Sequence, residues 1–303
     1  MAEQTSDTRC GFVALVGAPN VGKSTLVNEL VGAKVSIVTP KVQTTRSQVR
    51  GIAIHGSSQI VFIDTPGIFA PRRRLDRAMV KAAWSGAGDA DLVAILVDAK
   101  KGLDEEARNI IDKLSIAAGK KVLILNKIDL VPREALLAMA ATADKLAPFE
   151  RIFMVSAAKG DGVKDVLEYF AGSVPRGPFH YPADEITDVP MRLMAAEITR
   201  EKVYLRLHEE LPYQSTVETD SWKDRKDNSV RIEQTIFVGR ESQRKIVLGE
   251  GGRMIKSISI DARKEIEAAL EKKVHLFLHV KVRGDWENDP ERYRAAGLEF
   301  PKD

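Results

Sequence analysis

Residues 17–24 read Gly17-Ala18-Pro19-Asn20-Val21-Gly22-Lys23-Ser24, the G-x-x-x-x-G-K-S pattern of a phosphate-binding P-loop. Small residues let a run of backbone N–H groups wrap the phosphates of a nucleotide. In this pattern Lys23 reaches the β- and γ-phosphates, and the hydroxyl of Ser24 is a ligand of Mg²⁺. The apolar run 12–16 predicts a buried strand before the loop. Residues 24–30, with Thr25 at their start, predict a helix whose dipole favours the phosphates.

The composition is that of a globular protein: 44% of the 303 residues are hydrophobic and 29% are charged. The single cysteine, Cys10, excludes an internal disulfide, which fits a reducing cytosol. No apolar run approaches the roughly 20 residues that span a bilayer. Residues 1–9 are polar, lack the apolar core of a signal peptide, and are expected to be a frayed tail. The net charge of +3 is too small to indicate a partner.

Strands and helices are expected to alternate in the first part of the chain. Five apolar runs rich in β-branched residues recur, and helical patterns lie between the later ones. This order predicts an α/β domain with a mostly parallel sheet and helices on both faces. The five runs are 12–16, 60–63, 92–97, 122–125 and 152–155.

A second domain is expected after a proline-rich linker, because four prolines fall between residues 175 and 190 and cannot sustain a helix or central strand. Beyond it the patterns predict a smaller α+β domain of order αββααβ. Its helices are expected at 192–210, 244–248 and 254–272, and its strands at 214–219, 229–237 and 275–282. The predicted organisation is a first domain over 1–175, a linker over 176–190, a second domain over 191–285 and a polar tail over 286–303.

Three further motifs follow predicted strands, and together with the P-loop they indicate a guanine-nucleotide site. After 60–63 comes Asp64-Thr65-Pro66-Gly67, where the carboxylate can hold Mg²⁺ through water and the Gly67 N–H can contact the γ-phosphate. After 122–125 comes Asn126-Lys127-Ile128-Asp129, in which Asp129 can accept two hydrogen bonds from guanine. Adenine offers no matching pair of donors. After 152–155 comes Ser156-Ala157-Ala158-Lys159, which can present a backbone N–H to the guanine oxygen.

These four motifs resemble those of the translation-factor-related class of GTPases over residues 11–175. Such GTPases release a switch threonine from Mg²⁺ and the γ-phosphate after hydrolysis. Of the pair Thr44 and Thr45 we expect Thr45 to take this role, which leaves the metal ligands as Ser24, Thr45 and Asp64.

Hydrolysis is expected to proceed without a catalytic glutamine, because Ile68 and Phe69 follow Gly67 and neither can orient water by a hydrogen bond. The chain is similar here to GTPases in which a P-loop asparagine helps to coordinate K⁺ near the β/γ bridge, and Asn20 holds that position. Its alternative role is a small polar residue in a tight turn. The expected catalytic residues are therefore Asn20, Lys23, Thr45 and Gly67. Residues 72–74 form an arginine run, interpreted as a solvated or rRNA-facing patch, with an arginine finger as the alternative.

A nucleic-acid site is expected in the second domain, where Gly249-Glu250-Gly251-Gly252 joins two predicted helices. KH domains use such a G-x-x-G loop to clamp the backbone of about four unpaired nucleotides. Residues 176–303 hold 23 Lys and Arg against 24 Asp and Glu, so the basic surface must be local. Such a local basic segment is present, because residues 240–264 hold seven Lys and Arg against three acids. The expected RNA-binding residues are Lys245, Gly249, Glu250, Gly251, Gly252, Arg253 and Lys256, with the side chain of Glu250 turned away from phosphate.

A guanine-nucleotide domain, a short linker and a KH domain of the bacterial type (type II) resemble the Era family from residue 11 to about 286. The resemblance is carried by Thr44-Thr45-Arg46, by residues 64–67 and by the segment 247–256. It implies a monomeric, cytoplasmic GTPase that uses Mg²⁺ and binds near the 3′ end of 16S ribosomal RNA during assembly of the small ribosomal subunit. Two alternatives stay open: a nucleotide-gated RNA binder with negligible catalysis, and a GTPase attached peripherally to the inner membrane.

Overall fold

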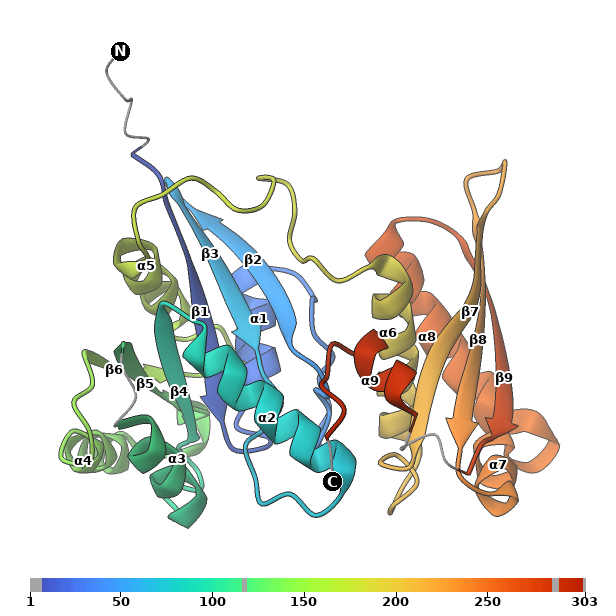
Figure 1. Ribbon diagram of the computed structural model, residues 1–303, viewed down its shortest axis with the longest axis horizontal. Helices are drawn as coiled ribbons and strands as arrows, with labels where there is room; N and C mark the ends of the chain where they lie inside the picture. The colour runs from blue at the N-terminus through green and yellow to red at the C-terminus, as the bar shows by residue number, and fades with distance from the viewer. Residues whose placement is uncertain (1–6, 116–118, 285–288, 302–303) are drawn as a thin grey trace. The chain divides into compact units, whose positions relative to one another are not determined.

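The computed structural model describes residues 7–115, 119–284 and 289–301, and it divides into two compact units (Figure 1). The first comprises Met1–Ser36, Thr45–Asp188 and Arg294–Asp303, and the second comprises Ile37–Thr44 and Val189–Tyr293. Residues 1–6 of the expected frayed tail lie outside the described residues. The end of this segment is ordered, because Thr8 Oγ1 donates to the carbonyl oxygen of Gly177 at 2.9 Å and Arg9 is the first residue of a strand. Within the described parts, no helix is long and apolar enough to cross a membrane.

A six-stranded sheet forms the centre of the first unit, in the order β2-β3-β1-β4-β5-β6. Only β2 runs antiparallel to its neighbour, and the other four pairings are parallel. Every residue of β3 and β4 is buried, as expected for strands covered on both faces. The strands are β1 Arg9–Gly17, β2 Val49–His55, β3 Ser58–Asp64, β4 Leu92–Asp98, β5 Lys120–Asn126 and β6 Arg151–Val155.

Helices cover both faces of this sheet, with α2 in front of it and α1 behind it in Figure 1. Helix α1 also packs against α5 and β2. The helices are α1 Lys23–Val31, α2 Arg74–Gly88, α3 Glu105–Ser115, α4 Arg133–Ala143 and α5 Val163–Ser173, with the short helix η1 at Ile128–Leu130. The architecture predicted from the alternating pattern is the one observed.

Besides the short η1, two elements of the first unit, β2 and α2, were not predicted from the sequence. Strand β2 lies at the edge of the sheet, with an exposed residue on either side of its buried centre, and Gly51 interrupts its apolar pattern. Helix α2 begins in the arginine run, and its buried stripe includes alanine and glycine as well as Leu75 and Met79. Both elements therefore lack the clear periodicity on which the prediction relied.

The second unit has the predicted order αββααβ and one three-stranded sheet, β7-β8-β9. Strands β7 and β8 are antiparallel, whereas β8 and β9 are parallel. The helices pack on one face of this sheet, because Val203 on α6, Ile236 on β8 and Ile258 on α8 share one buried cluster. The elements are α6 Met191–Arg206, β7 Ser215–Asp224, β8 Val230–Val238, α7 Glu241–Leu248, η2 Glu250–Gly252, α8 Arg253–Leu270, β9 Val274–Val282 and α9 Pro290–Ala295.

Some boundaries differ from those expected. Strand β7 runs to Asp224, five residues beyond the expected end, because its polar outer half still pairs with β8. Helix α6 ends at Arg206 rather than at residue 210, since Leu207 is already extended. The segment assigned to a polar tail contains α9, and beyond it Leu298 is buried and the guanidinium of Arg74 lies 5.0 Å from the Phe300 ring centre.

Candidate functional site

The P-loop connects β1 to α1 in a backbone shape that requires glycine at two points. Gly22 has φ 96°, and a Cβ there would lie 2.3 Å from the side-chain nitrogen of Asn126. A Cβ on Gly17 would lie 2.5 Å from the carbonyl oxygen of Leu96. Gly67 also lies close to this loop, because a Cβ on it would be 2.9 Å from the Cα of Pro19. The P-loop and the Asp64–Gly67 motif therefore meet at one edge of the sheet.

Lys23 is buried beneath the P-loop, and its Nζ donates hydrogen bonds to the carbonyl oxygens of Gly17 at 3.1 Å and Ala18 at 3.0 Å. Burial lowers the pKa of Lys23 to about 8, although Asp64 and Glu106 favour its charged form. Desolvation disfavours the charged form of Lys23, and a bound phosphate group would favour it. The lysine is thus held where an anion would stabilise it most.

Asp64 gathers three hydroxyl groups at the end of β3. Its Oδ2 accepts hydrogen bonds from Ser24 at 2.6 Å, Ser36 at 2.7 Å and Thr45 at 3.3 Å. The Oγ atoms of Ser24 and Thr45 are 2.9 Å apart. The other carboxylate oxygen of Asp64, Oδ1, is buried and has no hydrogen-bond partner among the described residues.

This oxygen cluster fits Mg²⁺, which prefers hard oxygen ligands and usually keeps several waters beside one or two carboxylates. Burial raises the pKa of Asp64, a cost that a divalent cation would relieve by favouring the carboxylate. The three residues expected as metal ligands, Ser24, Thr45 and Asp64, are brought together here. Thr44 is not part of this cluster, and its Oγ1 forms a hydrogen bond of 2.6 Å with the Oγ1 of Thr39.

Asn126 ties three of the motifs together. Its Nδ2 donates to the carbonyl oxygen of Val21 at 2.8 Å, and its Oδ1 accepts from the backbone N–H of Ala157 at 3.0 Å. The loop that begins at Ser156 and the P-loop are therefore both anchored to the end of β5. Thr65 is fixed in a similar way, because its hydroxyl donates to the carbonyl of Leu15 at 2.7 Å.

Asp129 is held in its ionised form. A hydrogen bond from Ser156 Oγ at 2.7 Å lowers the pKa of this carboxyl, and Lys159 at 3.7 Å acts in the same direction. An ionised carboxylate accepts hydrogen bonds and donates none, which is what recognition of guanine by its N1–H and amine requires.

Two residues of this edge were missed in the sequence. Asp98, at the end of β4, accepts a hydrogen bond from Lys127 Nζ at 2.7 Å. Lys127 also donates to the carbonyl oxygen of Asn20 at 2.7 Å. Ser36 is the second missed residue, and its bond to Asp64 is described above. Asp98 follows an apolar run as Asp64 does, so its position at a strand end was a usable signal, whereas nothing local marked Ser36.

The residues that replace a catalytic glutamine are apolar and fixed. Ile68 is 6% exposed, and its backbone N–H donates to the carbonyl oxygen of Gly17 at 3.1 Å. Asn20 is exposed at the tip of the P-loop with φ 62°. The arginine run starts α2, where the backbone N–H groups of Arg72 and Arg73 donate to Asp76.

The G-x-x-G loop of the second unit lies between α7 and α8. Gly249, Gly251 and Gly252 have φ of 70°, 60° and 76°, a region that L-residues rarely adopt. A Cβ on Gly251 or Gly252 would meet nothing within 4 Å, so both face open space. Glu250 forms an ion pair with Arg253. The loop thus offers exposed backbone for the close approach of a phosphate.

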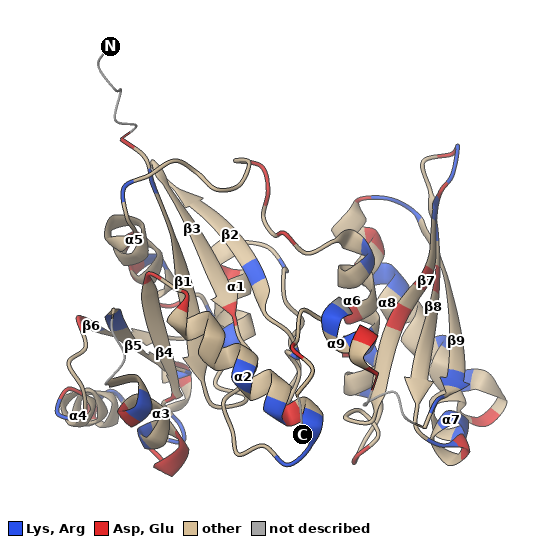
Figure 2. Cartoon of the chain, in the orientation of Figure 1, with Lys and Arg blue, Asp and Glu red and all other residues tan. Residues whose placement is uncertain are grey.

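Basic and apolar side chains flank this loop. Lys245, Arg253 and Lys256 are exposed, and Figure 2 marks basic residues along α7 and α8. Ile246 on α7 is 55% exposed and Ile260 on α8 is 38% exposed. An exposed apolar side chain beside lysines suits a nucleic-acid base next to its phosphate, and the sequence prediction had not included these isoleucines.

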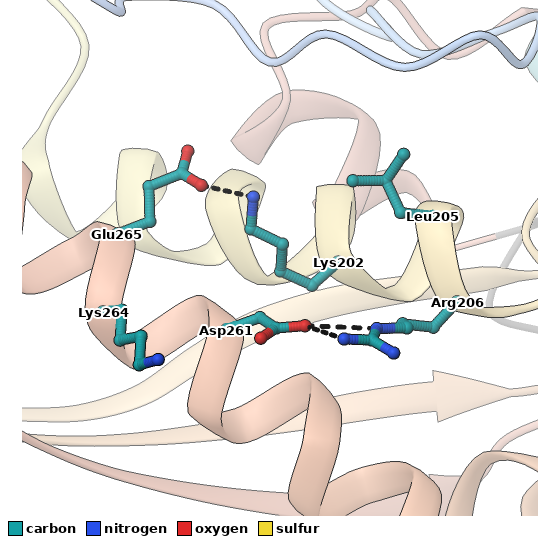
Figure 3. A pocket seen from close by; sticks show the side chains of 6 residues that line it. All are labelled: Lys202, Leu205, Arg206, Asp261, Lys264 and Glu265. Atoms are coloured by element: carbon teal, nitrogen blue, oxygen red, sulfur yellow. Dashed lines mark hydrogen bonds and ion pairs between the residues drawn. The ribbon is translucent and has the colours of Figure 1, made fainter.

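A separate hollow of about 440 Å³ lies between α6 and α8 (Figure 3). Its charged groups are largely paired with one another: Lys202 with Glu265, and Arg206 with Asp261. Ion pairs that satisfy each other leave little to recognise a ligand, so this hollow is not a candidate site.

Comparison with known proteins agrees with both units. Residues 12–127 match a family model described as a 50S ribosome-binding GTPase, and residues 210–287 match one described as a KH domain. Among curated proteins, GTPase Era of Bradyrhizobium sp. (strain BTAi1) is 66% identical, with 98% of this chain and 97% of that protein covered. GTPase Era of Brucella suis biovar 1 is 62% identical, with 98% and 96% covered.

Two solved structures of Era superpose on nearly the whole chain. One holds Era with MgGDPNP and nucleotides 1506–1542 of 16S ribosomal RNA, at a TM-score of 0.91 and 37% identity, covering 96% of this chain and 99% of that one. The other is a variant of Aquifex aeolicus Era bound to GDP and AlF4⁻, with the same score, identity and coverage. The predicted fold class, a P-loop GTPase domain followed by a KH domain, is confirmed.

Proposed function

This chain belongs to the Era family of GTPases, and from that premise we propose that it is a GTP-driven switch whose KH domain binds the 3′ end of 16S ribosomal RNA during assembly of the small subunit. The enzyme hydrolyses GTP to GDP and phosphate, which is the activity predicted from the sequence. The proposal extends this activity to the RNA and to the residues that perform each step. The meeting of Ser24, Thr45 and Asp64 beside the P-loop carries the nucleotide switch, and the exposed backbone of residues 249–252 supports the RNA site.

The nucleotide is bound by residues from four strand ends. The P-loop residues 17–25 surround the phosphates, while Asp129 accepts hydrogen bonds from guanine and Lys127 lies along the base. The N–H of Ala158 meets the guanine oxygen, because the N–H of Ala157 already donates to Asn126 Oδ1. Residues 64–67 line the γ-phosphate side, where the Gly67 N–H is the donor. This assignment is supported by the anchoring of all four loops to Asn126, Asp98 and Leu15.

Mg²⁺ held by Ser24, Thr45 and Asp64 would neutralise charge on the β- and γ-phosphates. Lys23 adds a second positive charge, and its burial strengthens the interaction because the local dielectric is low. Ile68 cannot orient the attacking water as a glutamine would, because its side chain makes no hydrogen bonds. The charge that develops in the transition state is therefore stabilised by Lys23 and by backbone N–H groups, and Asn20 is the residue that would hold a K⁺ ion to add positive charge there.

The RNA is clamped at residues 249–252 by backbone N–H groups, with Lys245, Arg253 and Lys256 neutralising phosphates. About four unpaired nucleotides fit such a loop. The exposed Ile246 and Ile260 are placed to contact bases. We propose that the protein acts in the cytoplasm as a monomer, and that Mg²⁺ and K⁺ are its metal partners.

A time course of phosphate release, with and without a 37-nucleotide RNA of the length 1506–1542 held by the Era structure, tests the proposal. Turnover that depends on Lys23, together with RNA binding that depends on Gly251, is the expected result. Turnover below background with intact RNA binding would favour the nucleotide-gated binder instead. Flotation with anionic liposomes tests the membrane alternative, and size-exclusion chromatography with light scattering tests the monomer.

A further inference from the structure

A groove of about 560 Å³ lies between α2 and α3 in the first unit, next to the nucleotide site. Large apolar side chains line it. Ile110 is buried at its base, whereas Phe69, Val80 and Trp84 are half-buried and so keep apolar surface accessible. Ile68, at one end, completes this lining. Accessible apolar surface in a concave site favours a ligand that carries its own large apolar side chain.

The lip of the groove is acidic. Asp104, Glu105 and Glu106 are consecutive residues at the start of α3, and among the described residues of the lining Lys113 is the one basic residue. Lys113 is already placed over the ring of Trp84, with its Nζ 5.7 Å from the ring centre. Burial raises the pKa of Glu106 and repulsion from Asp104 raises it further, whereas Lys101 and Lys23 lower it. A cation arriving at this lip would relieve that repulsion.

The same charges exclude other occupants. An acidic lip repels the phosphates of a nucleic acid and the headgroups of anionic lipids. The N-terminal segment of this chain, residues 1–8, carries Glu3 and Asp7 but no Lys or Arg, so it does not complement the lip either. The combination that fits is an apolar side chain flanked by lysine or arginine, because it complements both the apolar lining and the acidic lip.

The groove is also connected to the nucleotide site. Ile68 and Phe69 directly follow Gly67, and the backbone N–H of Ile68 is bonded to Gly17 of the P-loop. A γ-phosphate that engages Gly67 would act on the two residues next to it. One end of the groove is therefore built from the segment that GTP and GDP are expected to hold differently.

We propose that the α2–α3 groove is a docking site for a basic protein segment with a large apolar side chain, and that the bound nucleotide modulates its affinity. The segment places its apolar side chain over Phe69 and Trp84 and its cationic groups against Glu105 and Glu106. The groove lies in the first unit, whereas the RNA clamp at residues 249–252 lies in the second.

The probe is a fluorescent nine-residue peptide with leucine and phenylalanine flanked by lysines. It is measured by fluorescence anisotropy on the full chain loaded with a GTP analogue or with GDP. Two variant peptides, one with glutamates in place of the lysines and one with serines in place of the apolar residues, should both bind more weakly. Added salt should weaken binding of the lysine peptide, and its affinity should differ between the two nucleotide states.

Two exposed substitutions test the groove itself in opposite directions. Glu105→Lys should weaken binding about threefold to tenfold, and Lys113→Gln should strengthen it about twofold to fourfold, the range expected for partly exposed charge pairs. Glu134→Lys, an equal charge change on α4, should leave it unchanged. Equal binding of the lysine and glutamate peptides, or affinity that responds to neither groove substitution, would overturn the proposal. GTP turnover and RNA binding should persist in all variants, which separates this test from that of the proposed function.

Discussion

The side chain of Asp98 accepts a hydrogen bond of 2.7 Å from Lys127 Nζ, and this pair joins the ends of β4 and β5 beneath the expected position of the base. Asp98 is nearly buried, with 7% of its side chain exposed, whereas Lys127 is partly accessible. The carboxylate thus fixes the lysine that we propose lies along the guanine base. Its Oδ1 also accepts from the backbone N–H of Lys100 at 2.9 Å.

Asp98→Asn should weaken GTP binding by about 1–2 kcal/mol, or about fivefold to thirtyfold, because Lys127 loses a charged partner while the turn keeps an oxygen acceptor. Isothermal titration of GTP and GDP measures this change. Asp112→Asn, on the exposed side of α3, is the matched control and should have no effect. Equal affinities for both variants would show that Asp98 does not position Lys127 for the base.

Asp129→Asn should lower the affinity for GTP and raise that for xanthosine triphosphate. The amide loses one acceptor for guanine but gains a donor for the extra carbonyl of xanthine. Competition between the two nucleotides in a filter-binding assay gives the ratio directly. Unchanged selectivity for GTP would assign base recognition to another residue.

Lys23→Ala and Ser24→Ala should each reduce turnover by at least about a hundredfold, since each removes stabilisation of charge on the phosphates or on Mg²⁺. Ile68→Ala should retain measurable hydrolysis, because an isoleucine has no proton to give or take. Single-turnover phosphate release, at saturating GTP and with folding checked by circular dichroism, compares the three. A loss in Ile68→Ala as large as that in Lys23→Ala would contradict this division of roles.

Binding of GTP should become weaker as pH rises above about 8. In the free protein the pKa of Lys23 is lowered to about 8 by burial, and bound phosphate should raise it. Below pH 8 the lysine is charged before and after binding, so this group adds no pH dependence. Above pH 8 binding must take up a proton, and affinity falls by up to about tenfold per pH unit. Calorimetry in buffers of different ionisation enthalpy should detect the uptake, which Lys23→Met should abolish.

Gly251→Asp should weaken RNA binding more than Gly251→Ala. Both place a Cβ where φ is 60°, but only aspartate adds a charge that repels phosphate. Filter binding to a single-stranded ribosomal 3′ segment measures the affinities, which for the wild type should fall with salt by a slope of about −0.7 per phosphate contact. GTP affinity should be unchanged. A flat salt dependence, or three equal affinities, would leave the second domain without an assigned ligand.

Several features of this protein follow from the sequence alone because they depend on local order. Apolar runs place Asp64, Asn126 and Ser156 each just after a strand, and parallel strands bring their carboxyl ends to one edge. The P-loop can be predicted from the glycines of residues 17–24 alone, because they form one short local pattern. The order αββααβ and the G-x-x-G loop likewise lie within short segments that periodicity and glycine reveal.

Other features depend on which distant segments pack together, and only the tertiary structure decided them. Asp98 and Lys127 lie 29 positions apart, and Ser36 and Asp64 lie 28 apart. Ile37–Thr44 belongs to the second unit, where the Val38 N–H donates to Glu201 at 2.8 Å and Arg200 donates to the Thr44 carbonyl at 2.5 Å. Such contacts have no period or spacing in the sequence. They form because burial of apolar surface brings polar groups together, and each buried group must then find a partner.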